Sequence, residues 1–313
     1  MSEIINIQAR SVEGIGRGDW AAEVNAHHRA IDARLAALSA TFADPVALLG
    51  RAMAEAVTLP GKRFRGVLML MLGARLGGVN PALLDAACAV EMIHTASLVI
   101  DDLPAMDGAL TRRGQPTTHV AHGEARAILA GIALISESFR ILAALPAVDG
   151  GVRAALVEVL AEAIGPAGLC KGQDLDLHNA KSMRLIDREQ DLKTGQLFDA
   201  AFRIVARLQT CDEAKSDKLR GLSRMLGRAF QSYDDLLDLA PAGMGTGKTA
   251  GLDRGAGGPD KGLVAATGAE GAARHYRAIR RALDDELAAL WFDAESVRDY
   301  VASVLPSHAP RLG

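Results

Sequence analysis

The stretch Glu91–Gly114, EMIHTASLVIDDLPAMDGALTRRG, decides how this chain folds and where its chemistry lies. In it an apolar run, MIHTASLVI, leads directly into Asp101 and Asp102, and Asp107 follows after a short turn. Carboxylates beside such a run cost free energy unless a cation or hydrogen bonds compensate them. The stretch therefore predicts a helix that ends in a cluster of carboxylates with a specific partner.

Three polar side chains of this helix share one face. At about 100° per residue, His94, Ser97 and Asp101 point to the same side. Pro104 disfavours helix at the residue before it, so Asp107 has to return on an irregular turn. A lone histidine on an apolar helix is usually a hydrogen-bonded core residue, but the face shared with Asp101 favours ligand contact for His94.

A second acidic cluster lies in Phe230–Asp238, FQSYDDLLD, far along the chain. Separations of three and four residues bring its polar side chains to about one side of a helix. These are Gln231, Asp234, Asp235 and Asp238. Carboxylates without histidine or cysteine are hard oxygen ligands that suit Mg²⁺, which usually also takes phosphate oxygens of a substrate. Two solvated acidic faces are the alternative, but the presence of both clusters favours a metal between two facing helices.

Basic residues are interleaved with the acidic clusters. The segment GKRFR opens a helix after Pro60, and cations at a helix start oppose the helix dipole unless they hold an anion. Arginine forks and lysine point charges are the usual partners of diphosphates. Each cation alone has the properties of a surface charge, but the set predicts two diphosphates, one metal-bound and one held by cations. The set comprises Lys62, Arg65, Arg112, Arg113, Lys193 with Thr194, Lys248 and Lys261.

The composition is that of a soluble helical protein. The 313 residues carry 35 Lys and Arg against 38 Asp and Glu, a formal net charge of −3, and 49% are hydrophobic. Such a chain lacks the basic field of a general nucleic-acid binder. Aromatic residues make up only 4%, and apolar residues recur at helical spacing, so we expect an all-α fold. Without a Pro/Ser-rich linker or a repeat, we expect a single domain over residues 1–313.

No segment of the sequence predicts a secreted or membrane protein. The N-terminal segment MSEIINIQARSVEGIGRGDW lacks the pattern of a secretory signal. The richest apolar run, Val67–Leu72, is far shorter than the roughly 20 residues of a membrane span. Three distant cysteines, Cys88, Cys170 and Cys211, offer neither a disulfide framework nor metal-ligand spacing, which suits a reducing compartment. We therefore expect a cytoplasmic protein without a membrane span.

Together, these motifs resemble the signature of the trans-isoprenyl diphosphate synthases. The motifs are GKRFR, DDLPAMD with RRG, KTGQLF and FQSYDDLLD, and they extend from about Gly61 to Lys261. The stretch HTASLVIDDLPAMD is most similar to the bacterial geranylgeranyl diphosphate synthases of carotenoid pathways. The resemblance implies an all-α, single-domain bundle of helices around a central cavity, the isoprenoid synthase fold, which is usually homodimeric.

The resemblance also implies a role for each matching residue. Mg²⁺ on an allylic diphosphate would be held by Asp101, Asp107 and Asp234, with Asp102, Asp235 and Asp238 in support. The departing diphosphate would be stabilised by Arg112, Lys193 and Lys248, with Lys261 nearby, and the allylic cation by the oxygen dipoles of Thr194 and Gln231. Isopentenyl diphosphate would be held by Lys62, Arg65, His94 and Arg113. Its double bond would attack the cation, and the released diphosphate would take the final proton.

The resemblance further implies a product length. In this family, the residues one turn before the first acidic motif form the floor of the chain-growth pocket, and a bulky aromatic there stops growth at fifteen carbons. The corresponding Ala96 and Ser97 are small, which implies the twenty-carbon geranylgeranyl diphosphate, made from dimethylallyl, geranyl or farnesyl diphosphate. The alternatives are that both residues only permit close helix packing, or that the product is farnesyl diphosphate.

Some positions depart from the family's pattern. Gly131-Ile132 stands where Gly-Asp is frequent, and Gly66 stands where proline is usual. Before Lys261 the glycine-rich RGAGGPD is longer than usual, and Gly262 follows in place of serine or threonine. These departures concern the placement of Lys261 and the closing loop, and they leave the metal carboxylates intact.

Three other functions fit part of the sequence. Residues 242–249, AGMGTGKT, fit a relaxed P-loop of an ATPase, but neither a buried strand before them nor a helix after them is indicated. A terpene cyclase needs no second diphosphate site, so Lys62, Arg65 and Arg113 count against it. A non-catalytic partner subunit would be expected to lose metal carboxylates, and this chain retains both sets.

Overall fold

Helices form almost all of the regular structure in the computed structural model, which describes residues 20–42, 48–177, 183–237 and 263–310. The expected all-α fold is thereby confirmed. In chain order the helices are α1 (Trp20–Ser39), η1 (Ala40–Phe42), α2 (Leu48–Thr58), α3 (Phe64–Leu76), α4 (Pro81–Asp101), α5 (Thr118–His122), α6 (Glu124–Ala143), α7 (Gly150–Ile164), α8 (Leu169–Asp176), α9 (Met183–Gln190), the π-helical turn η2 (Asp191–Gly195), α10 (Gln196–Leu208), α11 (Glu213–Leu237), α12 (Leu263–Ala288) and α13 (Glu295–Val304).

Helix α4 carries the first acidic cluster at its C-terminal end. It begins where Asn80 accepts a hydrogen bond from the Leu83 N–H, and Pro81 takes the first helical position, where a missing N–H costs nothing. Most of its side chains are buried, chiefly against α6 and also against α3 and α10. The acidic cluster is therefore fixed to the best-packed part of the protein.

Helix α4 is also long and apolar enough to cross a membrane, by length and composition alone, with 21 residues and a mean hydropathy of 1.6. Its sequence contains no uninterrupted apolar run of this length, because Asp85, Glu91 and His94 lie within it. Of its most apolar window, 61% is buried inside the protein. The apolar surface of α4 is thus used by the protein core.

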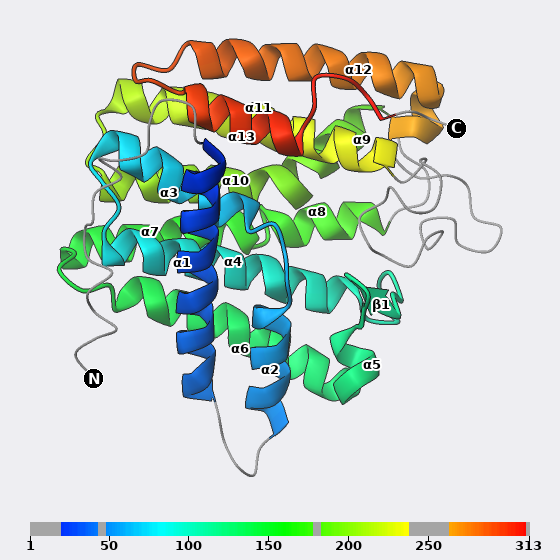
Figure 1. Cartoon of the computed structure of the whole chain (residues 1–313). Coiled ribbons are helices and arrows are strands. Elements are labelled where there is room, and N and C mark those ends of the chain that lie inside the picture. Colours follow the sequence, from blue (N-terminus) through cyan, green and yellow to red (C-terminus); the bar gives the residue numbers. More distant parts are fainter. Residues whose placement is uncertain (1–19, 43–47, 178–182, 238–262, 311–313) are drawn as a thin grey trace.

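Figure 1 shows α1 and α2 crossing in front of a set of long helices that run roughly side by side, among them α4, α6, α7 and α10. Helices α11 and α12 cover one side of this set, and α6 forms the other. The C-terminal end of α4, the hairpin that follows it and α9 lie toward the same end of the bundle. Segments that are distant in the sequence therefore meet at that end.

A short antiparallel hairpin follows α4. It consists of β1 (Thr111–Arg112) and β2 (Gln115–Pro116). Its turn places Arg113 (φ 53°) and Gly114 (φ 76°) in the left-handed region, which glycine adopts freely and arginine rarely does. Periodicity predicted no strand here, since two residues are too few for an alternating pattern.

Candidate active site

The turn after α4 brings Asp107 back to Asp101, as expected from Pro104. The Asp107 N–H donates to the Asp101 carbonyl at 2.8 Å. The Gly108 N–H donates to the Leu103 carbonyl at 3.0 Å, and Gly108 has a φ of 63°, which suits glycine. The first of these backbone hydrogen bonds therefore brings Asp101 and Asp107, the first and last acidic residues of DDLPAMD, next to each other.

The predicted polar face of α4 is present. His94, Ser97 and Asp101 are only half-buried on a helix whose other side chains are mostly fully buried. Ala96, by contrast, is fully buried, and its carbonyl oxygen lies 3.8 Å from the position that a Cβ on Gly131 of α6 would take. The two small residues expected at the pocket floor therefore have different surroundings.

Burial and neighbouring cations keep His94 neutral. Burial lowers the pKa of His94 well below its ordinary value, and the guanidinium groups of Arg65 and Arg113 lower it further. A neutral imidazole donates one hydrogen bond and accepts another. His94 can therefore offer a hydrogen-bond donor to an anion that the surrounding arginines attract.

Asp102 has a different partner from the one expected. Its side chain is buried, and Arg112 on β1 donates to both of its carboxylate oxygens, at 2.6, 2.8 and 3.1 Å. Such a bidentate pair uses lone pairs that a metal ion would otherwise take. Asp102 and Arg112 together hold the hairpin against the end of α4.

Lys193 lies opposite the first acidic cluster. Its Nζ, in η2, donates to Asp176 Oδ2 at 2.6 Å. Burial alone would lower the pKa of this lysine, but Asp101, Asp176 and Asp107 raise it above its ordinary value. The fold has therefore brought Lys193 within electrostatic reach of both carboxylates that end the DDLPAMD motif.

Two glycines allow η2 to lie close to its neighbours. A Cβ on Gly172 of α8 would lie 2.4 Å from the Lys193 nitrogen, and one on Gly227 of α11 would lie 2.7 Å from the Gly195 Cα. No larger side chain fits at such distances. The π-helical turn, a feature frequent at functional sites, thereby holds Lys193 and Thr194 between α8 and α11.

The second acidic cluster joins η2 through side-chain amides. The Thr194 hydroxyl donates to Gln231 Oε1 at 2.6 Å, so the two residues expected to act together are in contact. Gln231 and Gln190 donate to the two oxygens of Asp235, at 2.8 and 2.9 Å. The carboxylate of Asp235 therefore orients Gln231 and, through it, Thr194.

Arg65 is buried among aromatic rings. Its guanidinium carbon lies 4.3 Å from the centre of the Phe198 ring and 5.7 Å from that of Phe230. Burial lowers the pKa of Arg65 to about 10, although Glu91 and Asp234 act to raise it. Among the residues that the structure describes, its Nε has no hydrogen-bond partner. A buried cation with an unused donor suits an anionic substrate group.

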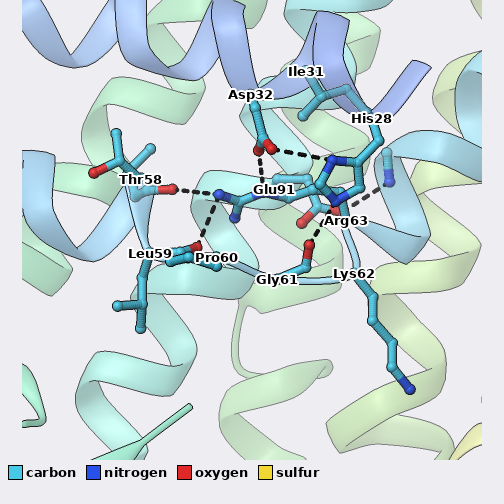
Figure 2. Close-up of polar contacts among 12 residues, drawn as sticks. His28, Ile31, Asp32, Thr58, Leu59, Pro60, Gly61, Lys62, Arg63 and Glu91 are labelled. Carbon is cyan, nitrogen blue, oxygen red and sulfur yellow. Dashed lines mark hydrogen bonds and ion pairs between the residues drawn. The ribbon is translucent and has the colours of Figure 1, made fainter. Parts of the chain in front are cut away.

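Lys62 and Arg113 both lie at the loop before α3. Nη1 of Arg113 donates to the Pro60 carbonyl at 2.9 Å, and a Cβ on Gly61 would lie 2.4 Å from that nitrogen, so only glycine permits this approach. Burial and the charge of Arg63 lower the pKa of Arg113. Figure 2 shows the Lys62 side chain extending away from the polar contacts of the loop. Lys62 is also exposed, so its ammonium is accessible to a ligand.

The donor chemistry of the acidic clusters fits a hard divalent cation. Carboxylate oxygens such as those of Asp101 and Asp107 are ligands that Mg²⁺ prefers. Within the described ranges, no three acidic, histidine or cysteine side chains come together closely enough to hold an ion by themselves. Mg²⁺ usually binds through one or two carboxylates and completes its shell with water and substrate phosphates. The arrangement suits a cation that binds together with a diphosphate.

Several expected site residues lie outside the described residues. These are Asp238, Lys248 and Lys261, with Gly262 and the segments AGMGTGKT and RGAGGPD. One departure from the family's pattern has a structural explanation. Gly66 donates its N–H to Glu91 Oε1 at 2.8 Å, a bond that proline cannot make. Gly131, which the pattern shares, lies against α4, where a Cβ would come within 2.8 Å of Ile100 Cδ1.

Comparison with known proteins agrees with these motifs. Residues 46–274 match the Polyprenyl synthetase family. The chain belongs to this family. A geranylgeranyl diphosphate synthase from Pseudescherichia vulneris is 42% identical over 238 residues, which cover 74% of this chain and 76% of that protein. One from Pantoea ananas is 40% identical over 214 residues, which cover 66% of this chain and 70% of that protein.

Solved structures that share the fold of this chain include a synthase and a geranyltransferase. The apo structure of an FPP/GFPP synthase from Zymomonas mobilis aligns with a TM-score of 0.78 at 29% identity, covering 91% of this chain and 99% of that one. A geranyltransferase from Helicobacter pylori, complexed with magnesium and isoprenyl diphosphate, aligns with a TM-score of 0.77 at 25% identity, covering 90% and 96%. The resemblance drawn from the motifs and the isoprenoid synthase fold are both confirmed.

Some residues that shape this polyprenyl synthetase site were not expected from the sequence. Asp176 holds Lys193, and Gln190 holds Asp235. Glu91 accepts a hydrogen bond from the Gly66 N–H in the first turn of α3. The segment LCKGQDLD, which ends at Asp176, is rich in polar residues. Spacing alone, however, cannot tell which of the two carboxylates in this segment faces a lysine from another part of the chain.

Proposed function

We propose that this chain is a prenyltransferase that condenses isopentenyl diphosphate with dimethylallyl, geranyl or farnesyl diphosphate to give geranylgeranyl diphosphate. The observation that carries this proposal is that the fold brings Lys193, held by Asp176, within electrostatic reach of Asp101 and Asp107, because a cation near carboxylates from another helix suits a site for a metal-bound diphosphate. The relatives from P. vulneris and P. ananas, which are geranylgeranyl diphosphate synthases, support the choice of product.

The proposed cofactor is Mg²⁺. Its proposed ligands are Asp101, Asp107 and Asp234, with Asp102, Asp235 and Asp238 in support. Asp102 supports the site by holding Arg112, and Asp235 by holding Gln231. When bound, Mg²⁺ supplies positive charge to the departing diphosphate and so assists cleavage of the allylic carbon–oxygen bond.

Lys193 binds the allylic diphosphate while keeping its hydrogen bond to Asp176, because an ammonium group has three donors. The raised pKa of Lys193 keeps its ammonium protonated while negative charge develops on the leaving diphosphate. Arg112 lies beside the same acidic cluster and adds a second cation. Lys248 and Lys261, which follow the second acidic cluster in the sequence, complete the proposed set of cations for this diphosphate.

Thr194 and Gln231 stabilise the allylic cation. Because the Thr194 hydroxyl donates its proton to Gln231, the rest of its oxygen surface carries lone pairs. Fixed oxygen dipoles of this kind stabilise positive charge without having to reorganise during the reaction. The pair is held by Asp235, so its orientation is set before substrate binds.

Isopentenyl diphosphate is held on the opposite side by cations and a neutral histidine, namely Lys62, Arg65, His94 and Arg113. Its double-bond electrons form the new carbon–carbon bond to the allylic cation, and the adduct then loses a proton to the released diphosphate. No protein nucleophile is required. The unused Nε donor of Arg65 supports the placement of a diphosphate beside α3.

The proposal is tested by supplying purified protein with isopentenyl diphosphate and each allylic primer, with Mg²⁺ or with EDTA, and identifying products by mass spectrometry. We expect a metal-dependent twenty-carbon diphosphate. A fifteen-carbon end product would retain the chemistry but make the enzyme a farnesyl diphosphate synthase. Absence of condensation with every primer would overturn the proposal and favour a partner subunit.

We also propose that the protein is a homodimer, works in the cytoplasm and supplies a carotenoid or another diterpenoid pathway. The apolar residues 83–100 are largely buried within the chain and leave little surface for an interface. Helix α6 instead exposes Ile128 (42%), Leu129 (52%) and Ile132 (55%), side chains that a second copy would cover. Light scattering should give a dimer mass, and Ile132→Glu should shift it to that of a monomer.

A further inference from the structure

The loop before α3 is held by side-chain nitrogens at three successive carbonyl groups. The Leu59 carbonyl accepts from Arg63 at 3.0 Å, the Pro60 carbonyl from Arg113 at 2.9 Å, and the Gly61 carbonyl from His28 at 2.7 Å. Figure 2 shows the contacts of Arg63 and His28 around this loop. Because its carbonyl oxygens are turned toward these side chains, the loop does not present them to an anionic ligand.

His28 reaches this loop from α1, which lies before the motifs that extend from Gly61 to Lys261. Its Nε2 contacts the Gly61 carbonyl, while its Nδ1 lies 3.1 Å from Asp32 Oδ2. The other oxygen of Asp32 accepts from Arg63 Nε at 2.9 Å. The Gly61 carbonyl and the Asp32 carboxylate are both acceptors, and the two ring nitrogens of His28 lie between them.

The position of His28 is set by the packing of α1. His28 and Asp32 are one helical turn apart on the same face, and Ile31 between them is fully buried in the core. Arg63 is also buried and adopts a left-handed conformation (φ 46°) that costs free energy and persists only when its surroundings hold it. The Asp32 carboxylate and the Val57 and Leu59 carbonyls provide that support.

We propose that His28 and Asp32 are a positioning pair for the diphosphate of isopentenyl diphosphate. His28 fixes the Gly61 carbonyl and Asp32 fixes Arg63, so the pair sets the backbone on both sides of Lys62 and thereby the direction of its side chain. Neither residue touches the substrate. The inference rests on the proposed function, because it assigns Lys62 to the isopentenyl site.

Amide substitutions separate the two contacts of the His28 ring. The amide nitrogen of His28→Gln can take the place of Nε2 and donate to Gly61, whereas that of His28→Asn reaches only the position of Nδ1, toward Asp32. If the loop bond matters, glutamine should retain function and asparagine should lose it. Arg29→Ala is the matched control, since Arg29 is exposed on the same helix.

The experiment measures KM for isopentenyl diphosphate, KM for farnesyl diphosphate, kcat and the melting temperature of each variant. We expect His28→Asn and His28→Ala to raise KM for isopentenyl diphosphate about tenfold, the effect of losing the hydrogen bond to the Gly61 carbonyl. KM for farnesyl diphosphate should stay within about twofold, and His28→Gln and Arg29→Ala should resemble the wild type.

Two results would overturn the inference. One is an equal rise in both KM values with a lowered melting temperature, which indicates general damage. The other is an unchanged KM for isopentenyl diphosphate in all three His28 variants. Calorimetric titration with isopentenyl diphosphate alone, without metal or primer, provides a reading that needs no turnover. A wild-type protein that binds this ligand but forms no product contradicts the proposed function and still leaves the His28 comparison measurable.

Discussion

Arg112 on the hairpin and Asp102 at the end of α4 form a buried bidentate pair, with Nη2 and Oδ1 2.6 Å apart. The side chains are 11% and 4% exposed, so water does little to weaken their attraction. The pair fixes Arg112 beside the carboxylates that we assign to the metal. The second aspartate of a DD motif is here a structural anchor for an arginine, which spacing along the chain does not reveal.

Removal of one partner of this pair should destabilise the protein. We expect Asp102→Asn to lower the free energy of unfolding by about 3 kcal/mol, because it leaves the Arg112 charge buried with a weaker partner. Urea unfolding followed by circular dichroism measures this change. A double-mutant cycle with Arg112→Met should give a cost well below the sum of the single costs. Additive costs would show that the two residues do not act as a pair.

Asp176 should be needed to orient Lys193. Their 2.6 Å contact and the tight fit of η2 against α8 leave the ammonium little freedom. We expect Asp176→Asn to reduce kcat/KM for the allylic substrate about tenfold, the size of one charge-assisted hydrogen bond. Steady-state kinetics with farnesyl diphosphate as the varied substrate measure it. Asp174→Asn, at an exposed position of the same helix, is the control, and equal losses in both variants would contradict the assignment.

Product length should respond to the size of residue 96. Ala96 is fully buried, and the contact between α4 and α6 beside it is tight, since even a Cβ on Gly131 would meet Ile100. A ring at position 96 therefore has no room toward α6 and has to fill space elsewhere. We expect Ala96→Tyr to shorten the product from twenty to fifteen carbons, as measured by mass spectrometry.

Ser97→Ala serves as the control for this change, because it removes only the hydroxyl that bonds the His94 carbonyl. We expect this variant to retain the twenty-carbon product. An unchanged product from Ala96→Tyr, in protein that melts at the wild-type temperature, would place the floor of the pocket at other residues.

Stability at acid pH should depend on Glu23. Burial acts to raise the pKa of Glu23, but hydrogen bonds from Arg75 and the nearby His27 ring lower it from 4.5 to about 2. A carboxyl whose pKa is lowered on folding stabilises the protein fully above its unfolded pKa, and this stabilisation is lost as the pH falls toward the folded pKa. The window for Glu23 therefore lies between about pH 4.5 and pH 2.

We expect Glu23→Gln to lower the free energy of unfolding by about 3 kcal/mol at pH 6 and by roughly half as much at pH 3. Urea titrations at the two pH values measure the difference. Glu270→Gln, in an exposed pair with Arg274, should cost little at either pH. A cost of Glu23→Gln that does not change with pH would mean that ionisation of Glu23 is not its source.

Much of this protein was predictable because the relevant patterns are local. Helical spacing alone placed His94, Ser97 and Asp101 on one face, and the half-buried state of all three agrees. Pro104 alone required a turn that returns Asp107 to Asp101. The resemblance to a family, and not spacing, predicted a shared role for Thr194 and Gln231, and the two side chains are in contact.

The GKRFR segment shows the limit of prediction from local sequence patterns. Its two arginines are two positions apart, and only the resemblance to a family, not their spacing, assigned Arg65 to the substrate. Arg63 is held by Asp32 and by backbone carbonyls, while Arg65 lies beside Phe198 with its Nε unpaired among the described residues. The difference arises because Asp32 comes from α1 and Phe198 from α10, helices that are distant in the sequence.

The sequence by itself determined the all-α class, the two acidic clusters and the cations that match them, because these depend on residue type and on spacing within a few helical turns. Only the tertiary structure decided which charge pairs with which, as in Arg112 with Asp102, Lys193 with Asp176 and His28 with Gly61. The physical reason is that hydrogen bonds and ion pairs act over a few ångströms. Their partners are chosen by the packing of helices whose positions no local pattern specifies.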